Sequence, residues 1–179
     1  MFLPSNAILL VIDIQGKLAR LMHKKDELFR NASKLIQTAT FLDIPVIVTE
    51  QAPDKIGKTI PEITKFLDKI QPITKSSFSC CGENRFLREL EALKRKQIIV
   101  IGIEAHVCVY QTASELLNKD FQVQVVADAV SSRTESNKYF GLDRIKSIGV
   151  GMTSTEMIIC ELLRTCEHPR FKEIVNLIK

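Results

Sequence analysis

Four nearly unbroken apolar runs, rich in β-branched residues, constrain the fold of this 179-residue chain more than any other feature. They are AILLVID at 7–13, IPVIVT at 44–49, QIIVIGI at 97–103 and FQVQVVA at 121–127. A strand with one face in water alternates apolar and polar residues, and these runs show little such alternation. They therefore predict strands buried on both faces, as in a parallel sheet covered by helices. Segments 72–75 and 148–152 are further strand candidates.

Between these runs the apolar residues change to a helical spacing. One stripe, from Leu28 to Leu42, advances in alternate steps of four and three residues and predicts a long helix. The same spacing occurs in segments 86–93, 109–117 and 158–163. Ser154 precedes the last of these and could cap its helix. Strands that alternate with helices predict a single α/β domain over residues 1–179, doubly wound around a parallel sheet with helices on both faces.

The composition limits the classes of protein to which the chain can belong. Apolar residues make up 45% of the sequence and charged residues 26%, and no apolar run approaches the roughly 18–20 residues that span a bilayer. The net charge is +4, and the lysines are spread along the chain without a dense basic tract. We therefore expect neither a nucleic acid nor a membrane as partner, whereas a small-molecule substrate, including an anionic one, is compatible with this charge.

The cysteines indicate a reducing compartment. Segment 1–15 has no basic region or cleavage site of a signal peptide, so it is interpreted as the start of the first strand. Five cysteines, an odd number, then predict reduced thiols in a cytoplasmic protein. There is no CxxC pair and the three histidines are scattered, so neither a metal nor another cofactor is expected.

Reactive residues stand where the predicted strands end. Asp13 ends the first run, Lys75 ends a short one, and Cys108 follows the 97–103 run across a turn. Ligands of open parallel sheets bind outside the carboxyl ends of the strands. We therefore expect an acid, a lysine and a thiol to converge at one edge of the sheet, beside a pocket-forming loop at 50–63.

Cys108 could act as a nucleophile with Asp13 and Lys75 as partners. At a helix N-terminus, the dipole and the free N–H groups lower the pKa of a thiol, and the N–H groups can also bind an oxyanion. Asp13 could accept the thiol proton, while the Lys75 ammonium orients that carboxylate and stabilises the thiolate. Each residue also has a structural alternative: a buried core cysteine, a solvated or capping aspartate, and a surface lysine.

Several segments carry a resemblance to a known family. They are 11-VIDIQ-15, 75-KSSFS-79 and 101-IGIEAHVCVYQTA-113, followed by 127-ADAVSSR-133 and 153-TSTE-156. In this order they resemble the signature segments of the isochorismatase-like cysteine hydrolases. The loop at 50–63, the GIEAHVC sequence and the tail HPRFKEIVNLIK are similar to one branch, the isochorismatase-domain-containing proteins.

The resemblance implies a fold, a reaction and catalytic residues. The fold is a six-stranded parallel sheet in the order 3-2-1-4-5-6. The reaction is cleavage of a small amide, ureido or related carbonyl compound through a cysteine thioester. The implied catalytic triad is Asp13, Lys75 and Cys108. The backbone N–H groups of Glu104 and Cys108 would face the oxyanion, next to a cis peptide bond at Ile103–Glu104. Family members usually assemble, which implies a homo-oligomer.

Candidate residues of the substrate pocket lie in the same quoted segments: Gln15, Glu50, Phe78 and His106. For His106 the alternative is a loop position outside the pocket. The Glu104 side chain could face either the substrate or a neighbouring subunit.

Two departures from other family members narrow the chemistry. Nicotinamidases of this family carry a metal site after the second strand, built on an Asp-x-His pair and further histidines. Here that place reads Thr49-Glu50-Gln51-Ala52, so no metal is expected. True isochorismatases cleave a vinyl ether without needing the thiol, so the presence of Cys108 favours acyl chemistry.

Two other classes of function compete with a hydrolase. The chain could be a catalytically idle scaffold or binding protein that keeps the fold, although the intact set of Asp13, Lys75 and Cys108 favours an enzyme. It could also be a thiol redox protein that uses Cys80 or Cys81 as the resolving thiol. The alternative for this adjacent pair is packing in the core.

Overall fold

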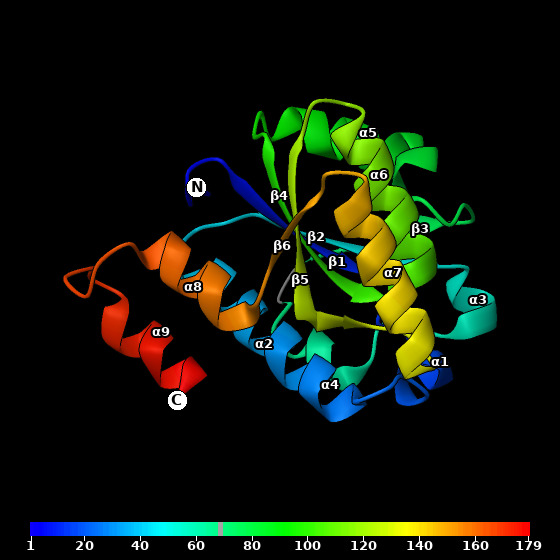
Figure 1. The fold of residues 1–179 in the computed structure, drawn as a ribbon, viewed down its shortest axis with the longest axis horizontal. Coiled ribbons are helices and arrows are strands. Elements are labelled where there is room, and N and C mark those ends of the chain that lie inside the picture. The colour runs from blue at the N-terminus through cyan, green and yellow to red at the C-terminus, as the bar shows by residue number, and fades with distance from the viewer. Residues whose placement is uncertain (68–69) are drawn as a thin grey trace.

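Six parallel strands form the sheet of the computed structural model, which describes residues 1–67 and 70–179. The strand order is β3-β2-β1-β4-β5-β6 (Figure 1). The strands are β1 (Ala7–Ile12), β2 (Val46–Gln51), β3 (Ile73–Lys75), β4 (Gln97–Ile103), β5 (Gln122–Ser131) and β6 (Gly151–Thr153). The order and the parallel pairing confirm the predicted doubly wound fold.

Helices cover both faces of this sheet. One face packs against α2 (Lys25–Phe41), α8 (Thr155–Leu163) and α9 (Phe171–Ile178). The other packs against α5 (Asn84–Ala92), α6 (Tyr110–Leu117) and α7 (Glu135–Ser147). Three short helices, α1 (Gly16–Arg20), α3 (Pro53–Ile56) and α4 (Pro61–Thr64), follow the ends of β1 and β2. None of the helices in the described part of the chain is both long and apolar enough to cross a membrane.

The two faces explain why the apolar runs show so little polar alternation. In β1, Leu9 and Val11 point to the α2 face, whereas Ile8 and Leu10 point to the α6 face, and all four are buried. Successive side chains of a strand point to opposite faces, so a strand covered on both sides must be apolar throughout.

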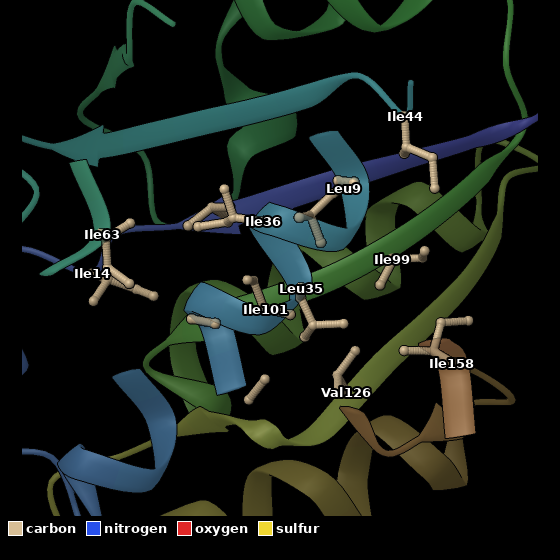
Figure 2. Packing of buried hydrophobic residues seen from close by; sticks show 14 of the residues in the cluster. Leu9, Ile14, Leu35, Ile36, Ile44, Ile63, Ile99, Ile101, Val126 and Ile158 are labelled. Atoms are coloured by element: carbon tan, nitrogen blue, oxygen red, sulfur yellow. The ribbon is translucent and has the colours of Figure 1, made fainter. Parts of the chain in front are cut away.

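The α2 face is a continuous apolar core. Figure 2 shows Leu35 of α2 and Ile158 of α8 lying over the central strands, together with Leu9 of β1 and Ile99 of β4. The predicted stripe of α2 and the predicted Ser154 cap are both confirmed, since the Ser154 hydroxyl accepts a hydrogen bond from the Met157 N–H. The C-terminal segment also packs inside the chain, because Ile174 of α9 is buried in this core.

Some elements differ from the sequence-based expectations. The predicted strand at 121–127 extends to Ser131, beyond a register irregularity opposite β4, and the 148–152 candidate forms its strand only from Gly151. The helix α7 was not predicted. Its sequence ESNKYFGLDRIKS has few apolar residues, and Gly141 and Ile145 are its fully buried positions.

A glycine allows the two central strands, β1 and β4, to approach closely at the end of β1, directly before Asp13. Gly102 of β4 has φ +122, and a Cβ atom at this position would lie 2.0 Å from the carbonyl oxygen of Ile12. Gly149 has a comparable φ of +90, but a Cβ atom there would meet nothing within 4 Å.

We therefore expect Gly102→Ala to lower the free energy of unfolding considerably more than Gly149→Ala. The Gly149 variant carries only backbone strain, of order 1–3 kcal/mol, whereas the Gly102 variant adds a clash with β1. Urea unfolding of both variants measures the difference, and equal losses would contradict this account of Gly102.

Candidate active site

Three chain segments bring Asp13, Lys75 and Cys108 together at the carboxyl ends of the strands. Asp13 directly follows β1, and Lys75 is the last residue of β3. Cys108 lies in a five-residue π-helical turn, Ala105–Val109, between β4 and α6. The three residues are 3%, 2% and 8% exposed, respectively, so they meet in a nearly dry environment.

The Asp13 carboxylate is the centre of this cluster. The Lys75 Nζ atom lies 2.6 Å from its Oδ2 atom, and the Thr49 hydroxyl donates to Oδ1 at 2.8 Å. The Cys108 thiol lies close enough to the same carboxylate for each group to shift the pKa of the other. No described donor is ideally aligned on Oδ2, so the Lys75 contact is an ion pair more than a directed hydrogen bond.

The Lys75 ammonium is fully enclosed by protein. Besides Asp13 it contacts the Gln51 side-chain oxygen at 2.7 Å and the backbone carbonyls of Ser77 and Phe78 at 3.1 and 3.0 Å. The alternative of a surface lysine is therefore wrong. These contacts satisfy the ammonium and hold it against Asp13, as burial of a charge requires.

Burial shifts the pKa values of both the acid and the thiol. The pKa of Asp13 is raised above its ordinary value because burial disfavours the carboxylate more than the Lys75 charge and the hydrogen bonds favour it. Burial likewise raises the pKa of Cys108 to about 12; Lys75 opposes this shift and the Asp13 charge adds to it.

The raised pKa of Cys108 corrects the expectation of a thiol ionised by a helix N-terminus. Cys108 precedes the first residue of α6, Tyr110, by two positions. A hydrogen bond from the Glu104 backbone does favour the thiolate, but burial outweighs it. The Ile103–Glu104 peptide bond, just before this turn, is cis.

A small cavity of about 100 Å³ opens beside the thiol. Asp13, Cys108 and Glu104 line it, as do the candidate pocket residues Gln15 and Phe78. The other lining residues are Leu18, Gln51, Ile56, Ile103 and Val107. The sequence analysis did not predict these five residues, although Gln51 ends β2 and Val107 directly precedes Cys108.

Two of the candidate pocket residues do not line this cavity. The buried Glu50 carboxylate accepts hydrogen bonds of 2.7 Å from both the N–H and the hydroxyl of Thr59, so it anchors the loop after β2. The His106 ring points to Ser132, whose hydroxyl lies 2.9 Å from Nδ1. The pocket assignment of both residues is therefore corrected, and for His106 the loop alternative holds.

Gln15 lines the cavity, but its amide is already engaged by the backbone. Its oxygen accepts from the Gln51 N–H at 2.6 Å, and its nitrogen donates to the carbonyls of Gly57 and Gln51 at 2.6 and 3.2 Å. Gln15 thereby joins the end of β2 to the turn that follows α3. Ile56, the last residue of α3, directly precedes that turn and lines the cavity.

The carboxylate of Glu104 is paired on its outer side. Its Oε2 atom accepts from the backbone N–H of Arg133 at 3.0 Å and from the Arg133 Nε at 3.2 Å. The Glu104 side chain is 10% exposed and that of Arg133 is 56% exposed.

The neighbouring thiols are core residues. Cys80 is fully buried, with its sulfur 3.8 Å from the Thr49 hydroxyl, and burial raises its pKa to about 12. Burial also raises the pKa of Cys81, to about 11. These surroundings favour the packing alternative for the pair.

We expect bulky maleimide reagents to modify the exposed Cys160 and Cys166 faster than Cys108 at pH 7, because a thiol with a pKa of about 12 is almost entirely protonated there. The modification rate of Cys108 should rise about tenfold per pH unit between pH 7 and 10. Peptide mass spectrometry over time gives each rate, and a plateau of the Cys108 rate near neutral pH would disprove the raised pKa.

The sequence matches the isochorismatase domain over residues 7–157. It is 37% identical over 173 residues to isochorismatase domain-containing protein 2 of Danio rerio, with 97% of this chain and 87% of that protein covered. No group of three or more His, Cys, Asp or Glu side chains suited to a metal ion was found in residues 1–67 and 70–179.

Solved structures share the fold over nearly the whole chain. The MAR1 ribonuclease from Caenorhabditis elegans superposes with a TM-score of 0.94 at 37% identity, covering 99% of this chain and 91% of that one. The YcaC gene product of Escherichia coli, described as an octameric hydrolase of unknown specificity, superposes with a TM-score of 0.88 at 23% identity, covering 99% and 94%.

Proposed function

Because the chain belongs to the isochorismatase family, we propose that it is a cysteine hydrolase that cleaves a small amide, ureido or related carbonyl compound. The observation that carries this proposal is the position of the Cys108 thiol, beside the buried Asp13–Lys75 pair and on the wall of a cavity. Nucleophilic catalysis requires a thiol, a base within reach and a third group that orients the base.

In the first half of the proposed reaction, Asp13 takes the thiol proton as the sulfur of Cys108 attacks the carbonyl carbon. The raised pKa of Asp13 makes it a stronger base than an ordinary carboxylate, and its transfer partner is a thiol that is protonated at rest. The new C–S bond forms while the C–N bond breaks, and the leaving amine receives the proton from Asp13.

In the second half, a water molecule gives a proton to Asp13 and attacks the thioester. The acid product leaves, and the proton on Asp13 returns to the sulfur. Through both halves, the backbone N–H groups of Glu104 and Cys108 face the oxygen of the reacting carbonyl. This role is supported by the proximity of the Glu104 backbone to the Cys108 sulfur, where it lowers the pKa of the thiol, because a donor placed there is near the carbonyl that the sulfur attacks.

Lys75 positions the base and takes no proton in this scheme. Its ammonium is held by the Gln51 side chain and two carbonyl oxygens, so the charge stays fixed beside Asp13 throughout. Its charge favours the ionised carboxylate and so opposes the rise in the Asp13 pKa that burial causes.

The competing functions have less support. A resolving thiol must ionise readily, and burial raises the pKa of both Cys80 and Cys81 well above the ordinary range. The Caenorhabditis elegans neighbour is named a ribonuclease, but a cavity of about 100 Å³ lined by two carboxylates fits an anionic polynucleotide poorly. An idle scaffold gives no reason to bury an ion pair against a thiol.

We also propose that the protein forms a homo-oligomer, as the Escherichia coli neighbour is described to do. The exposed aromatic pair of α7, Tyr139 and Phe140, each 64% exposed, is an apolar surface that a second copy could cover.

The proposed chemistry is tested with a panel of small amides, ureido compounds and esters, read by intact-protein mass. We expect wild-type protein to accumulate an acyl adduct on Cys108 and Cys108→Ser to form none. Asp13→Asn should lower turnover by about 10²–10⁴-fold, the usual effect of losing a general base. The matched variant Cys160→Ser, which removes an exposed thiol, should keep full activity. Unchanged activity of Cys108→Ser would disprove the proposal, and RNA in the same panel tests the ribonuclease alternative.

We further propose that turnover needs no added metal. The side chains at the end of β2 are already engaged, Glu50 with Thr59 and Gln51 with Lys75. The hydrolysis rate should therefore be unchanged after dialysis against excess chelator. A loss of activity that zinc or iron restores would contradict this expectation.

A further inference from the structure

The charged residues found in the lining of the cavity beside Cys108 are all acidic. Of the residues found to line it, Asp13 and Glu104 are acidic and none is a lysine or an arginine. The nearest ammonium, that of Lys75, lies behind Asp13 with a side chain that is 0% exposed. Its partners, described above, surround it, so it offers no donor to a substrate anion.

The two oxygens of the Glu104 carboxylate differ in their hydrogen bonding. Both hydrogen bonds from Arg133 go to Oε2, and no donor among the described residues is found on Oε1. Arg133 itself does not line the cavity. Glu104 is therefore held by Arg133 through Oε2, while Oε1 keeps its acceptor capacity with respect to the described residues.

Much of the remaining lining is apolar. Five apolar side chains were found there: Leu18, Ile56, Phe78, Ile103 and Val107. The cavity has a volume of only about 100 Å³. A space of this size suits an acyl group of a few carbon atoms better than a large ring.

We propose that the substrate is a small, uncharged aliphatic amide or urea-like compound, and that Glu104 is the residue that determines this specificity. The carboxylate repels a substrate that carries a carboxylate of its own, and its Oε1 atom accepts a hydrogen bond from an N–H group of the substrate. The inference rests on the proposed function of the site, since it places the scissile carbonyl beside Cys108.

The charge discrimination can be measured without turnover, using iodoacetamide and iodoacetate. The two reagents have nearly the same shape and alkylate a thiol in the same way: the S–C bond forms, the C–I bond breaks and iodide leaves. One reagent is neutral and the other is anionic. Peptide mass spectrometry at pH 8.5 gives the rate of each at Cys108 and, in the same sample, at the exposed Cys160 and Cys166.

For the wild-type protein we expect the ratio of the iodoacetamide rate to the iodoacetate rate to be at least about tenfold larger at Cys108 than at the two exposed thiols. Taking this ratio removes the effect of the thiol pKa, because that pKa slows both reagents equally. Equal ratios at the three cysteines, or faster labelling of Cys108 by iodoacetate, would overturn the inference.

Two variants assign the discrimination to Glu104. Glu104→Gln should lower the Cys108 ratio by about threefold or more, and Arg133→Gln should raise it, because the carboxylate then loses its counter-ion. A general loosening of the site cannot produce opposite changes. Glu173→Gln removes the acidic partner from another arginine–glutamate pair, the one with Arg170 on α9, and should leave the ratio unchanged. An unchanged ratio in Glu104→Gln would overturn the role of this residue.

Failure of the inference and failure of the hydrolase proposal give different results. If Cys108 prefers iodoacetamide but no compound in the panel yields an acyl adduct, the charge preference stands and the hydrolase proposal fails. If acyl adducts form fastest from amides that carry a carboxylate, such as succinamate compared with butyramide, the hydrolase stands and this substrate class is wrong.

Discussion

The buried ion pair between Asp13 and Lys75 is the constraint on which the rest of the site depends. Two charges removed from water are tolerated only when they are paired and hydrogen-bonded, and removing one partner costs about 3–5 kcal/mol. Here the pairing is completed by Thr49 and Gln51, both from β2, which lies between the strands that carry the two charges. The register of three neighbouring strands therefore sets the position of the Asp13 carboxylate, and the turn after β4 places Cys108 beside it.

The convergence of these residues could be predicted from the sequence because it follows from topology. The apolar runs locate the parallel strands, and their carboxyl ends must share one edge, which places Asp13 and Lys75 at the same edge as the Cys108 turn. The family resemblance, confirmed by the similarity to isochorismatase domain-containing proteins, supplied the strand order. The burial of the thiol could not be predicted in this way, because it depends on packing, and it reversed the expected direction of the Cys108 pKa shift.

Side-chain direction was the other property that the sequence did not contain. Glu50 and His106 stand at the positions expected of pocket residues. However, the Glu50 side chain contacts the Thr59 hydroxyl and the His106 ring contacts the Ser132 hydroxyl. Neither hydroxyl could be identified as a partner from the sequence. Gln15 does reach the cavity, but as a connection between backbone segments. The sequence also did not predict the helix α7. This helix packs closely against the turn before α6 through Gly141, where a Cβ atom would lie 2.7 Å from the backbone nitrogen of His106. Packing through a glycine produces no apolar periodicity in the sequence.

The position of Lys75 on an edge strand gives the site a property that its chemistry alone would not suggest. The strand β3 has three residues and pairs with β2 through three residue pairs, whereas β1, which leads into Asp13, is enclosed between two neighbours (Figure 1). Short edge elements open at lower free energy than the strands of a core. Detachment of β3 alone would separate the ammonium from Asp13 and expose Ile73, while the rest of both apolar clusters stays packed. Hydrolytic competence would then be a local equilibrium at the rim of the sheet, distinct from the global folding equilibrium of the domain.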